Sequence, residues 1–584
     1  MTSITVFVIA LSYNQVIELF PSGGGGYKVA TKLIGPRAGL VSGSALIVDY
    51  VLTIAISVAS GMDALFSLLP ESVHFVKLAA TLVVVVVLIG LNLRGMKESI
   101  QVLLPVFVGF FVTHAWLIVY GIIDHADRVP TVLPDTLADT QSLVHDSGWF
   151  FAVALFLRAY SLGGGTYTGL EAVSNNVHML AEPRVKTGKW TMIYMAASLS
   201  FTAGGIILLY LLWDAQPVEG KTLNAVVFGS IIGTFDWGPL ATNMLILLVL
   251  AFEAGLLVVA ANTGFLGGPA VLASMAADSW MPHQFRHLSN RLVTQNGVLL
   301  MGICALAILL WTGGSVSVLV VLYSINVFLT FSLSLFGLCR YWLGRRRDRR
   351  WLRRFALSAV GFAMTSGILL VTVVEKFIEG GWLTLVVTGV VIVVAVAIRR
   401  HYDDTTGQLK KADQLYADEP YGSVTETPEA DRLAPTAVFV IGSSRGGGMY
   451  ALKWVQSHFP GHFRNFMFIS ARAVDAHSYG GEQELKQLRQ EATVNLRYYV
   501  NYCRSHGLAA DSRISFGTDA AQEVIRLADA VRNDFPNCMF FTSKLVFPRE
   551  TWFVRALHNQ TAMAMQSRLH LKGMEMMILP MRVA

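Results

Sequence analysis

Three consecutive glycines stand inside a long apolar segment, in Leu157-Arg158-Ala159-Tyr160-Ser161-Leu162-Gly163-Gly164-Gly165-Thr166-Tyr167-Thr168-Gly169-Leu170-Glu171. Each glycine costs a helix about 1 kcal/mol relative to alanine. A broken helix inside a membrane exposes backbone dipoles, which is tolerated only beside a cavity or a binding site. We therefore expect a break at Gly163–Gly165 that presents Gly163, Gly164 and the Thr166 hydroxyl to a solute. Close packing of the glycines against a neighbouring helix is the alternative.

The composition places this segment in a membrane protein. Of 584 residues, 54% are hydrophobic and only 14% are charged, and the mean hydropathy is +0.53. Soluble domains carry about 25% charged residues, so the first 400 residues do not form a soluble enzyme. The four cysteines form no CxxC pair, so neither a metal cluster nor a disulfide framework is indicated, and we expect no cofactor.

Apolar segments long enough to span a bilayer recur along the first 400 residues. A spanning helix needs about 20 apolar residues. We count eleven candidates, at 2–20, 38–69, 74–93, 100–123, 149–178, 190–213, 238–264, 293–313, 315–341, 354–375 and 381–399. The second and fifth are long, which suggests a tilt or an internal break.

The charges of the connecting loops predict the orientation. Loop 340–354 is rich in arginine, whereas loop 124–148 carries five aspartates against one arginine, and every second loop is basic. Basic loops stay in the cytoplasm. The chain is therefore expected in a bacterial-type plasma membrane, with its C-terminus in the cytoplasm.

The C-terminal part has a different pattern. Residues 1–400 form the expected transporter domain, 401–433 a polar linker and 434–584 a cytoplasmic α/β domain. In the last of these, short apolar runs alternate with amphipathic stretches, which predicts a parallel sheet. The strands are expected near 437–441, 466–470, 514–516, 539–545 and 576–579, and the helices near 449–458, 483–506, 519–533 and 550–571.

The first turn of this domain is glycine-rich, with Gly442-Ser443-Ser444-Arg445-Gly446-Gly447-Gly448. Such a turn can bind an anion such as a nucleotide phosphate, or it can simply close a strand–helix unit. It also matches the G-x-S-x-G elbow of hydrolases letter for letter, but a small domain that opens with this strand is the wrong setting for that chemistry.

Four charged residues lie well inside the predicted spans: Asp49, Arg158, Glu171 and Glu253. Such charges are costly, so each is a functional candidate, with a structural ion pair or a water-facing position as the alternative. Glu171 is either a coupling acid or a cap of the second half-helix. Asp49 and Glu253 are candidate proton carriers.

Three hydroxyls share one face of the second span. Tyr50, Thr53 and Ser57 are spaced i, i+3 and i+7, which places them on one side of a helix. A lipid-facing stripe would not carry them, although hydroxyls also bond the i−4 carbonyl at helix contacts. Tyr323 begins a second polar group, Tyr323-Ser324-Ile325-Asn326, in the ninth span.

Three motifs together resemble the amino acid–polyamine–organocation (APC) superfamily. They are Phe20–Tyr27 (FPSGGGGY), Gly163–Asn175 (GGGTYTGLEAVSN) and the Glu182-Pro183-Arg184 loop, and the likeness covers about residues 11–400. Residues 48–61 (VDYVLTIAISVASG), 157–175 and the C-terminal domain are most similar to KimA-type potassium importers of that superfamily.

The resemblance implies a LeuT-like inverted repeat of helices, followed by a cytoplasmic α/β domain similar to universal stress proteins. It implies potassium sites lined by Tyr50, Thr53, Ser57, Thr166 and Tyr323, uptake coupled to protons, and a homodimer formed partly through the C-terminal domain. Superfamily members have twelve helices, and this chain begins at the second. We therefore expect either that a broken first helix is encoded upstream of Met1 or that the gene product has lost it.

Three functions follow as hypotheses. The first is proton-coupled uptake of potassium by a secondary transporter, because hard hydroxyl oxygens suit an alkali cation. The second is an amino acid permease. The third is a membrane sensor that does not transport, whose domain at 434–584 binds a nucleotide or another partner. The lipid bilayer is the expected environment, and we expect neither enzymatic activity nor a nucleic-acid partner.

Overall fold

The computed structural model describes residues 2–163, 169–289, 291–417, 428–442, 444–473, 482–546, 557 and 561–582. The chain divides into two compact units. The helical unit comprises Met1–Met275 and Gln295–Val394, and the α/β unit comprises Ala276–Thr294 and Ala395–Ala584. Each unit is described separately.

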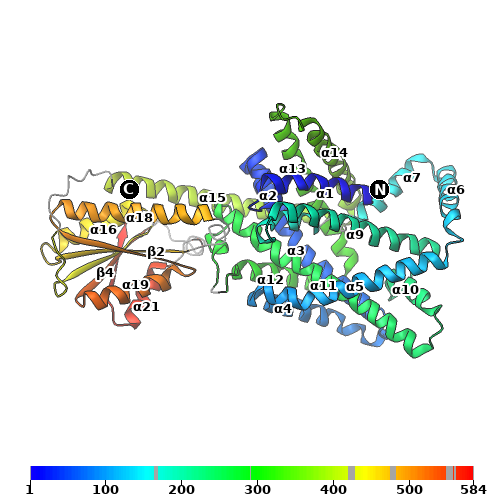
Figure 1. Cartoon of the computed structure of the whole chain (residues 1–584), viewed down its shortest axis with the longest axis horizontal. Coiled ribbons are helices and arrows are strands. Elements are labelled where there is room, and N and C mark those ends of the chain that lie inside the picture. The colour runs from blue at the N-terminus through cyan, green and yellow to red at the C-terminus, as the bar shows by residue number, and fades with distance from the viewer. Residues whose placement is uncertain are drawn as a thin grey trace. The chain divides into compact units, whose positions relative to one another are not determined.

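The α-helices up to the start of the sheet follow one another in the order shown in Figure 1. They are α1 (Thr2–Leu19), α2 (Gly25–Val29), α3 (Pro36–Phe66), α4 (Lys77–Arg94), α5 (Met96–Asp124), α6 (Val129–Ser147), α7 (Trp149–Leu162), α8 (Gly169–Asn175), α9 (Arg184–Leu212), α10 (Leu223–Gly233), α11 (Pro239–Ala277), α12 (Gln295–Thr312), α13 (Val316–Gly344), α14 (Trp351–Lys376) and α15 (Trp382–Tyr416).

Every apolar segment predicted from the sequence falls on one or more of these helices. By length and composition alone, eight described helices can cross a membrane. That count joins α14 and α15 into one stretch, Trp351–Tyr416, and it treats α1 and most of α7 as shorter apolar helices. The number eleven therefore stays a prediction.

Helices α3 and α13 form the interior of the helical unit. The most apolar window of α3 is 83% buried and that of α13 is 61% buried, whereas the other candidate spans reach only 17–33%. The two helices pack against each other. Their small and hydroxyl-bearing residues therefore lie inside the protein, while the outer helices present apolar side chains to the surroundings.

Two stretches that we expected to be loops contain helices. Helix α6 lies in 124–148 and begins with Pro130 in its first turn, a position that suits proline. Helix α10 lies in 214–237, and the Thr222 side chain caps it by accepting a hydrogen bond from the Ala225 N–H. Phe228 and Ile231 of α10 pack in an apolar cluster with Leu117. The alternation of basic and acidic loops predicts orientation only. It does not indicate whether a loop contains a short helix, so α6 and α10 could not be predicted from it.

In the fifth predicted span, the first described helix ends where the run of glycines begins. Helix α7 ends at Leu162, with Gly163 as its C-cap, and helix α8 begins at Gly169. Gly164, Gly165 and Thr166 lie outside the described residues. By contrast, α3 runs unbroken from Pro36 to Phe66, so the length of the second span does not reflect a break.

The α/β unit contains the predicted parallel sheet. Its strands are β1 (Thr436–Val440), β2 (Asn465–Ala473), β3 (Ala509–Gly517), β4 (Cys538–Leu545) and β5 (Met576–Met581), in the spatial order β3-β2-β1-β4-β5. All neighbouring strands are parallel. The helices are α16 (Arg445–His458), α18 (Glu482–Ser505), α19 (Ala520–Asp534) and α21 (Thr561–Leu571). The predicted helix at 550–571 is described only from Thr561.

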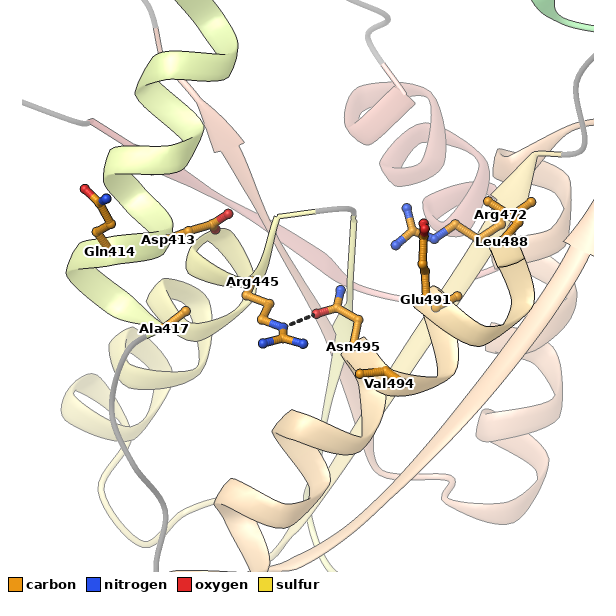
Figure 2. Close-up of a pocket in the computed structure, with 10 residues that line it drawn as sticks. Asp413, Gln414, Ala417, Arg445, Arg472, Leu488, Glu491, Val494 and Asn495 are labelled. Carbon is orange, nitrogen blue, oxygen red and sulfur yellow. Dashed lines mark hydrogen bonds between the residues drawn. The ribbon is translucent and has the colours of Figure 1, made fainter. Parts of the chain in front are cut away.

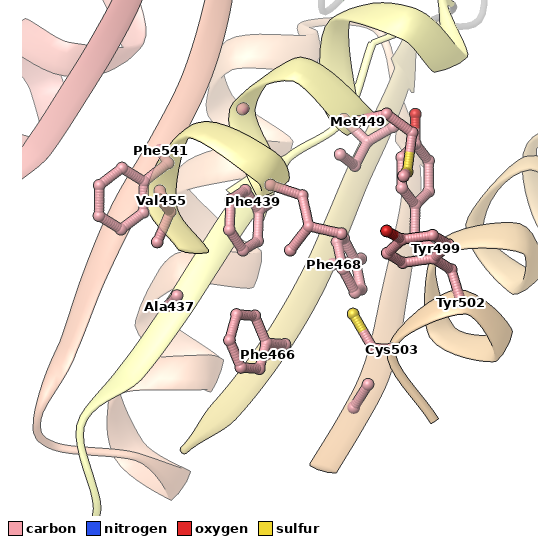
Figure 3. Close-up of a cluster of buried hydrophobic side chains, with 14 of the residues drawn as sticks. Ala437, Phe439, Met449, Val455, Phe466, Phe468, Tyr499, Tyr502, Cys503 and Phe541 are labelled. Carbon is pink, nitrogen blue, oxygen red and sulfur yellow. The ribbon is translucent and has the colours of Figure 1, made fainter. Parts of the chain in front are cut away.

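Helices cover both faces of this sheet, as Figure 1 shows, with α16 and α18 on one face and α19 and α21 on the other. Phe439 of β1 is fully buried at the centre of the first face (Figure 3). Its ring stacks on Phe468 at 5.4 Å and on Phe541 at 5.7 Å between ring centroids. Strand β1 is therefore buried on both sides, as expected for the central strand of a parallel sheet.

The glycine-rich turn is shorter than the sequence suggested. Helix α16 begins at Arg445, so Gly446, Gly447 and Gly448 form its first turn. A Cβ at Gly448 would lie 2.7 Å from Cζ of Tyr499, and a Cβ at Gly447 would lie 2.8 Å from the Ser543 hydroxyl. These glycines permit close packing of the helix, and that need, which depends on distant residues, was not visible in the sequence.

We predict that Phe439→Ala destabilises the α/β unit by about 3–5 kcal/mol, because it leaves a cavity beside the rings of Phe468 and Phe541. The measurement is the urea midpoint for proteolysis of this unit in the full-length protein. The half-exposed Val494→Ala provides the control, and the free energy of unfolding derived from its midpoint should be within about 0.5 kcal/mol of the wild type. Equal midpoints for Phe439→Ala and Val494→Ala would contradict the packing described.

Candidate functional site

The predicted hydroxyl face of α3 lies in the interior of the helical unit. Tyr50, Thr53 and Ser57 are 4%, 5% and 8% exposed. The Thr53 hydroxyl donates a hydrogen bond to the Asp49 carbonyl at 2.9 Å, which is the i−4 contact expected of a helical threonine. This bond uses the hydroxyl proton and leaves the oxygen lone pairs directed away from the helix backbone.

Two other helices bring polar groups to this face. Tyr323 of α13 lies with its hydroxyl 3.4 Å from the Thr53 hydroxyl. The Tyr50 hydroxyl accepts a hydrogen bond from Asn175 Nδ2 of α8 at 2.5 Å. The structure therefore joins three of the residues predicted from the sequence, Tyr50, Thr53 and Tyr323, into one cluster. We call Tyr50, Thr53, Asn175 and Tyr323 the oxygen cluster.

Asp49 lies on α3, directly before Tyr50. It is 6% exposed, and its Oδ1 atom has no hydrogen-bond partner among the described residues. An ionised carboxylate oxygen without a partner is costly in an apolar interior. Asp49 is therefore a buried acid on the same helix as Tyr50 and Thr53, and one of its oxygens is unpaired among the described residues.

Glu171 is also deeply buried, at 4% exposure. Its Oε1 atom accepts a hydrogen bond from the Gly26 N–H of α2 at 3.1 Å. Its Oε2 atom accepts one from the Thr330 hydroxyl of α13 at 3.2 Å. The carboxylate thus connects α8 with two other helices, and these bonds do not cap its own helix.

The glycine run before α2 allows this contact. A Cβ at Gly26 would collide with Oε1 of Glu171, and a Cβ at Gly25 would collide with the Asn175 amide. Gly24 has a φ of 103°, a conformation that favours glycine. The motif at Phe20–Tyr27 therefore has a physical reason: only glycine lets this segment approach α8 so closely.

Among the predicted ligands at the break, only Gly163 lies within the described residues, whereas Gly164 and Thr166 fall outside them. No described atom lies within 4 Å of the position that a Cβ would take at Gly163. Close packing against a described neighbour, the alternative explanation for the glycines, is therefore not found at this position.

The polar residues of Tyr323–Asn326 on α13 face two different parts of the helical unit. Tyr323 faces Thr53, whereas Ser324 and Asn326 contact the helices behind α13. The Lys376 ammonium of α14, which is 1% exposed, donates to Ser324 Oγ at 2.6 Å and to the Val320 carbonyl at 3.1 Å. Thr388 of α15 donates to Asn326 Oδ1 at 3.2 Å. These bonds fix the part of α13 that carries Tyr323.

The two remaining intramembrane charges are bound elsewhere. Arg158 of α7 forms an ion pair with Glu379 at 2.7 Å, and both side chains are partly exposed. For Arg158, the structure therefore shows the ion pair that the sequence left open as the alternative to a functional charge. Glu253 of α11 accepts a hydrogen bond from Asn224 of α10 at 2.7 Å, and so belongs to a separate polar network.

Sequence reasoning missed the roles of Asn175, Thr330 and Lys376. Two of them carried a spacing signal: Asn175 is four residues after Glu171, and Thr330 is seven residues after Tyr323, so each shares a helix face with a predicted site residue. Lys376 stood at the end of a predicted span, where a lysine normally extends to the membrane surface, and nothing in the sequence indicated its burial.

The α/β unit contains a cavity of about 540 Å³ at the end of strands β1 and β2. Its charged and amide side chains are Asp413, Gln414, Arg445, Arg472, Glu491 and Asn495. Figure 2 shows Arg445 directed toward Asn495, whose Oδ1 accepts a hydrogen bond from Arg445 Nε at 3.1 Å. Arg472 donates to the Gly442 carbonyl at 3.1 Å, while its Nε has no partner among the described residues. Burial lowers the pKa of Arg472.

An internal carboxylate occupies the start of α16. Asp413 Oδ1, from the end of α15, accepts hydrogen bonds from the Gly446 N–H at 2.6 Å and from the Ser444 hydroxyl at 2.7 Å. The Ser444 side chain also caps α16 by accepting from the Gly447 N–H. The N–H group of Gly446 and the hydroxyl of Ser444 are therefore bonded to a carboxylate of the chain itself, and binding of an external anion at this turn stays a prediction. Ser444, the serine of the hydrolase-like pattern, is a helix cap.

We predict that Asp413→Ala exposes the first turn of α16. Removing a charged acceptor leaves the Gly446 N–H without its partner, at a cost of about 1.5–3 kcal/mol. Hydrogen–deuterium exchange of peptides that contain residues 445–450 should then be at least about tenfold faster than in the wild type. Asp404→Ala, an exposed aspartate of the same helix, is the control and should leave this exchange unchanged. Equal exchange in all three proteins would contradict the contact.

Comparison with known proteins supports a transport role for the helical unit. A family model described as amino acid permease matches residues 1–398. The chain is 30% identical over 428 residues to a protein named potassium transporter KimA of Bacillus subtilis. The matched region covers 73% of this chain and 68% of that protein.

Two further relatives are named as probable potassium transport system proteins. Kup 1 of Aeromonas hydrophila is 27% identical over 62% of this chain and 55% of its own length. Kup of Nitrosomonas eutropha is 28% identical over 31% of this chain and 26% of its own length. The match to each Kup protein covers less than two thirds of that protein.

The family match covers more than half of the chain and includes α3, α8 and α13, which carry the oxygen cluster. The predicted resemblance is thus confirmed, and the chain is an integral membrane transporter and not an enzyme. It belongs to the amino acid permease family.

Proposed function

We propose that the chain takes up potassium as a secondary active transporter driven by protons. The oxygen cluster carries this proposal, because buried hydroxyls from α3 and α13 lie within hydrogen-bond distance of each other in the interior of the helical unit. The printed names of KimA and the Kup proteins, which refer to potassium, support the same substrate.

The ligand set follows from the chemistry of alkali cations. Potassium sheds its hydration shell most readily for several neutral, hard oxygen atoms at once. Tyr50, Thr53, Ser57 and Tyr323 supply hydroxyls from the described residues. In this proposal the backbone at Gly163 and Gly164 and the hydroxyl of Thr166 complete the site from the break between α7 and α8.

Asp49 and Glu171 are the acids that couple uptake to protons in this proposal. Asp49 adjoins Tyr50 and has an oxygen without a partner among the described residues, so a proton or a nearby cation can neutralise it in turn. Glu171 is held by two donors and connects the second half-helix with α2 and α13. Alternating neutralisation of these acids by a proton and by potassium links the two fluxes.

An amino acid permease is the second candidate, and the description of the family favours it. In that case the N-terminal end of α8 would bind the substrate carboxylate, and open carbonyls at the break would bind the ammonium. The two substrates require different tests, because an amino acid fills a cavity and an alkali ion fills an oxygen cage.

The α/β unit is assigned a regulatory role, on the cytoplasmic side of the membrane and within a homodimer. Arg445 and Arg472 line its cavity, and arginines bind phosphate groups in a bidentate manner. A nucleotide is therefore the proposed regulator. If the helical unit does not transport, this cavity makes a ligand-binding sensor the remaining function.

The test is rubidium uptake, as a tracer for potassium, by proteoliposomes that contain the full chain. We predict that Thr53→Ala lowers uptake at least tenfold, because it removes a ligand oxygen. Thr81→Ala is the matched control: Thr81 is equally buried, bonds its i−4 carbonyl at 2.8 Å and lies on α4, away from the oxygen cluster. Its uptake should be within twofold of the wild type.

Growth of a host that lacks potassium uptake and uptake of radiolabelled amino acids complete the test. Rescue of growth by the wild type but not by Thr53→Ala supports potassium transport. Amino acid uptake without rescue would reject potassium in favour of the second candidate. Nucleotide binding without flux of any solute would favour the sensor.

A further inference from the structure

A buried histidine and a buried glutamate face each other in a second polar network of the helical unit. His114 of α5 is 1% exposed and Glu253 of α11 is 9% exposed. His114 Nε2 lies 3.9 Å from Glu253 Oε2, and neither atom has a hydrogen-bond partner among the described residues. Glu253 was predicted to be a candidate proton carrier, and His114 is a partner for it that no local pattern in the sequence indicated.

The other nitrogen of His114 fixes where the ring proton lies. Nδ1 is 3.0 Å from the Phe110 carbonyl oxygen, which can only accept a hydrogen bond, so Nδ1 carries a hydrogen. The Thr113 hydroxyl, 3.3 Å from Nδ1, donates to the Gly109 carbonyl at 2.8 Å. In the neutral ring Nε2 is then an acceptor with a free lone pair.

The glutamate is similarly fixed on its other side. Glu253 Oε1 accepts a hydrogen bond from Asn224 Nδ2 at 2.7 Å. Asn224 Oδ1 in turn accepts one from the Tyr210 hydroxyl at 2.5 Å. These two hydrogen bonds occupy Oε1 and leave Oε2 of an ionised Glu253 as a second acceptor directed toward His114.

Two acceptors that face each other in a buried, largely apolar setting repel, and one added proton removes the repulsion. The proton makes either an imidazolium beside a carboxylate or a carboxylic acid beside a neutral imidazole. We propose that His114 and Glu253 form a binding site for a single proton, separate from the oxygen cluster. Its use in driving uptake rests on the proposed transport function, whereas the proton site itself does not.

The surroundings suit a site that keeps its proton. The Phe110 ring stacks on the imidazole at 3.8 Å between centroids, and Phe228 of α10 contacts its edge at 5.0 Å. Among the described residues, the titratable groups that face Glu253 are His114 of α5 and, through Asn224 of α10, Tyr210 of α9. The site therefore joins α5, α9, α10 and α11, so loading it with a proton changes the contact between these helices.

Glu253→Gln tests the site, because the glutamine amide can donate to His114 Nε2 and imitate the loaded state without a proton. We expect a potentiometric titration of the purified full chain, carried from neutral to mildly alkaline pH, to release one more proton from the wild type than from the variant. His114→Gln, which can donate to Oε2, should lose the same proton. Glu375→Gln, a partly buried acid of α14, should release as many as the wild type.

Equal proton release from the wild type and from folded Glu253→Gln and His114→Gln would overturn the proposed site. Rubidium uptake then separates the site from its use: in Glu253→Gln, with Asp49 and Glu171 intact, uptake should respond less to an imposed pH gradient than in the wild type. A full response would overturn the coupling role. Absence of rubidium flux in the wild type would reject the proposed transport function instead, and the titration would still decide whether the proton site exists.

Discussion

The carboxylate of Glu171 is the contact on which the geometry of the helical unit depends. Its two oxygens bind the Gly26 N–H and the Thr330 hydroxyl, and so connect α8 with α2 and α13. A buried carboxylate is stable only while its donors stay in place, so these three segments are fixed as a set. Because Asn175 lies one turn after Glu171 on α8, the same contact positions its amide on Tyr50.

Hydrogen bonds from residues outside the oxygen cluster also hold α13 in place. Lys376 and Thr388 hold the part of α13 that carries Tyr323, so the hydroxyls near Thr53 are presented by a fixed framework. The His114–Glu253 pair lies on other helices and has different chemistry: acceptors that need a proton, in contrast to hydroxyls that suit a cation. In the α/β unit, Asp413 similarly fixes α15 to the start of α16.

Helical and strand periodicity predicted much of this from the sequence. The shared face of Tyr50, Thr53 and Ser57, the end of α7 at the glycines and the five strands of the sheet are found in the structure. Partners from distant segments could not be predicted in this way, because no local pattern connects Gly26 with Glu171 or His114 with Glu253. The glycines of α16 were read as a turn because their neighbours, Tyr499 and Ser543, come from elsewhere in the chain.

The account makes the oxygen cluster the place where the cation binds. Thallium replaces potassium in oxygen sites and scatters anomalously, so the most direct measurement is its position in an experimental structure of the full chain. The predicted result is a single strong peak in contact with the hydroxyls of Thr53 and Tyr323. A peak located away from α3 and α13, and out of contact with the hydroxyls of the cluster, would contradict the account.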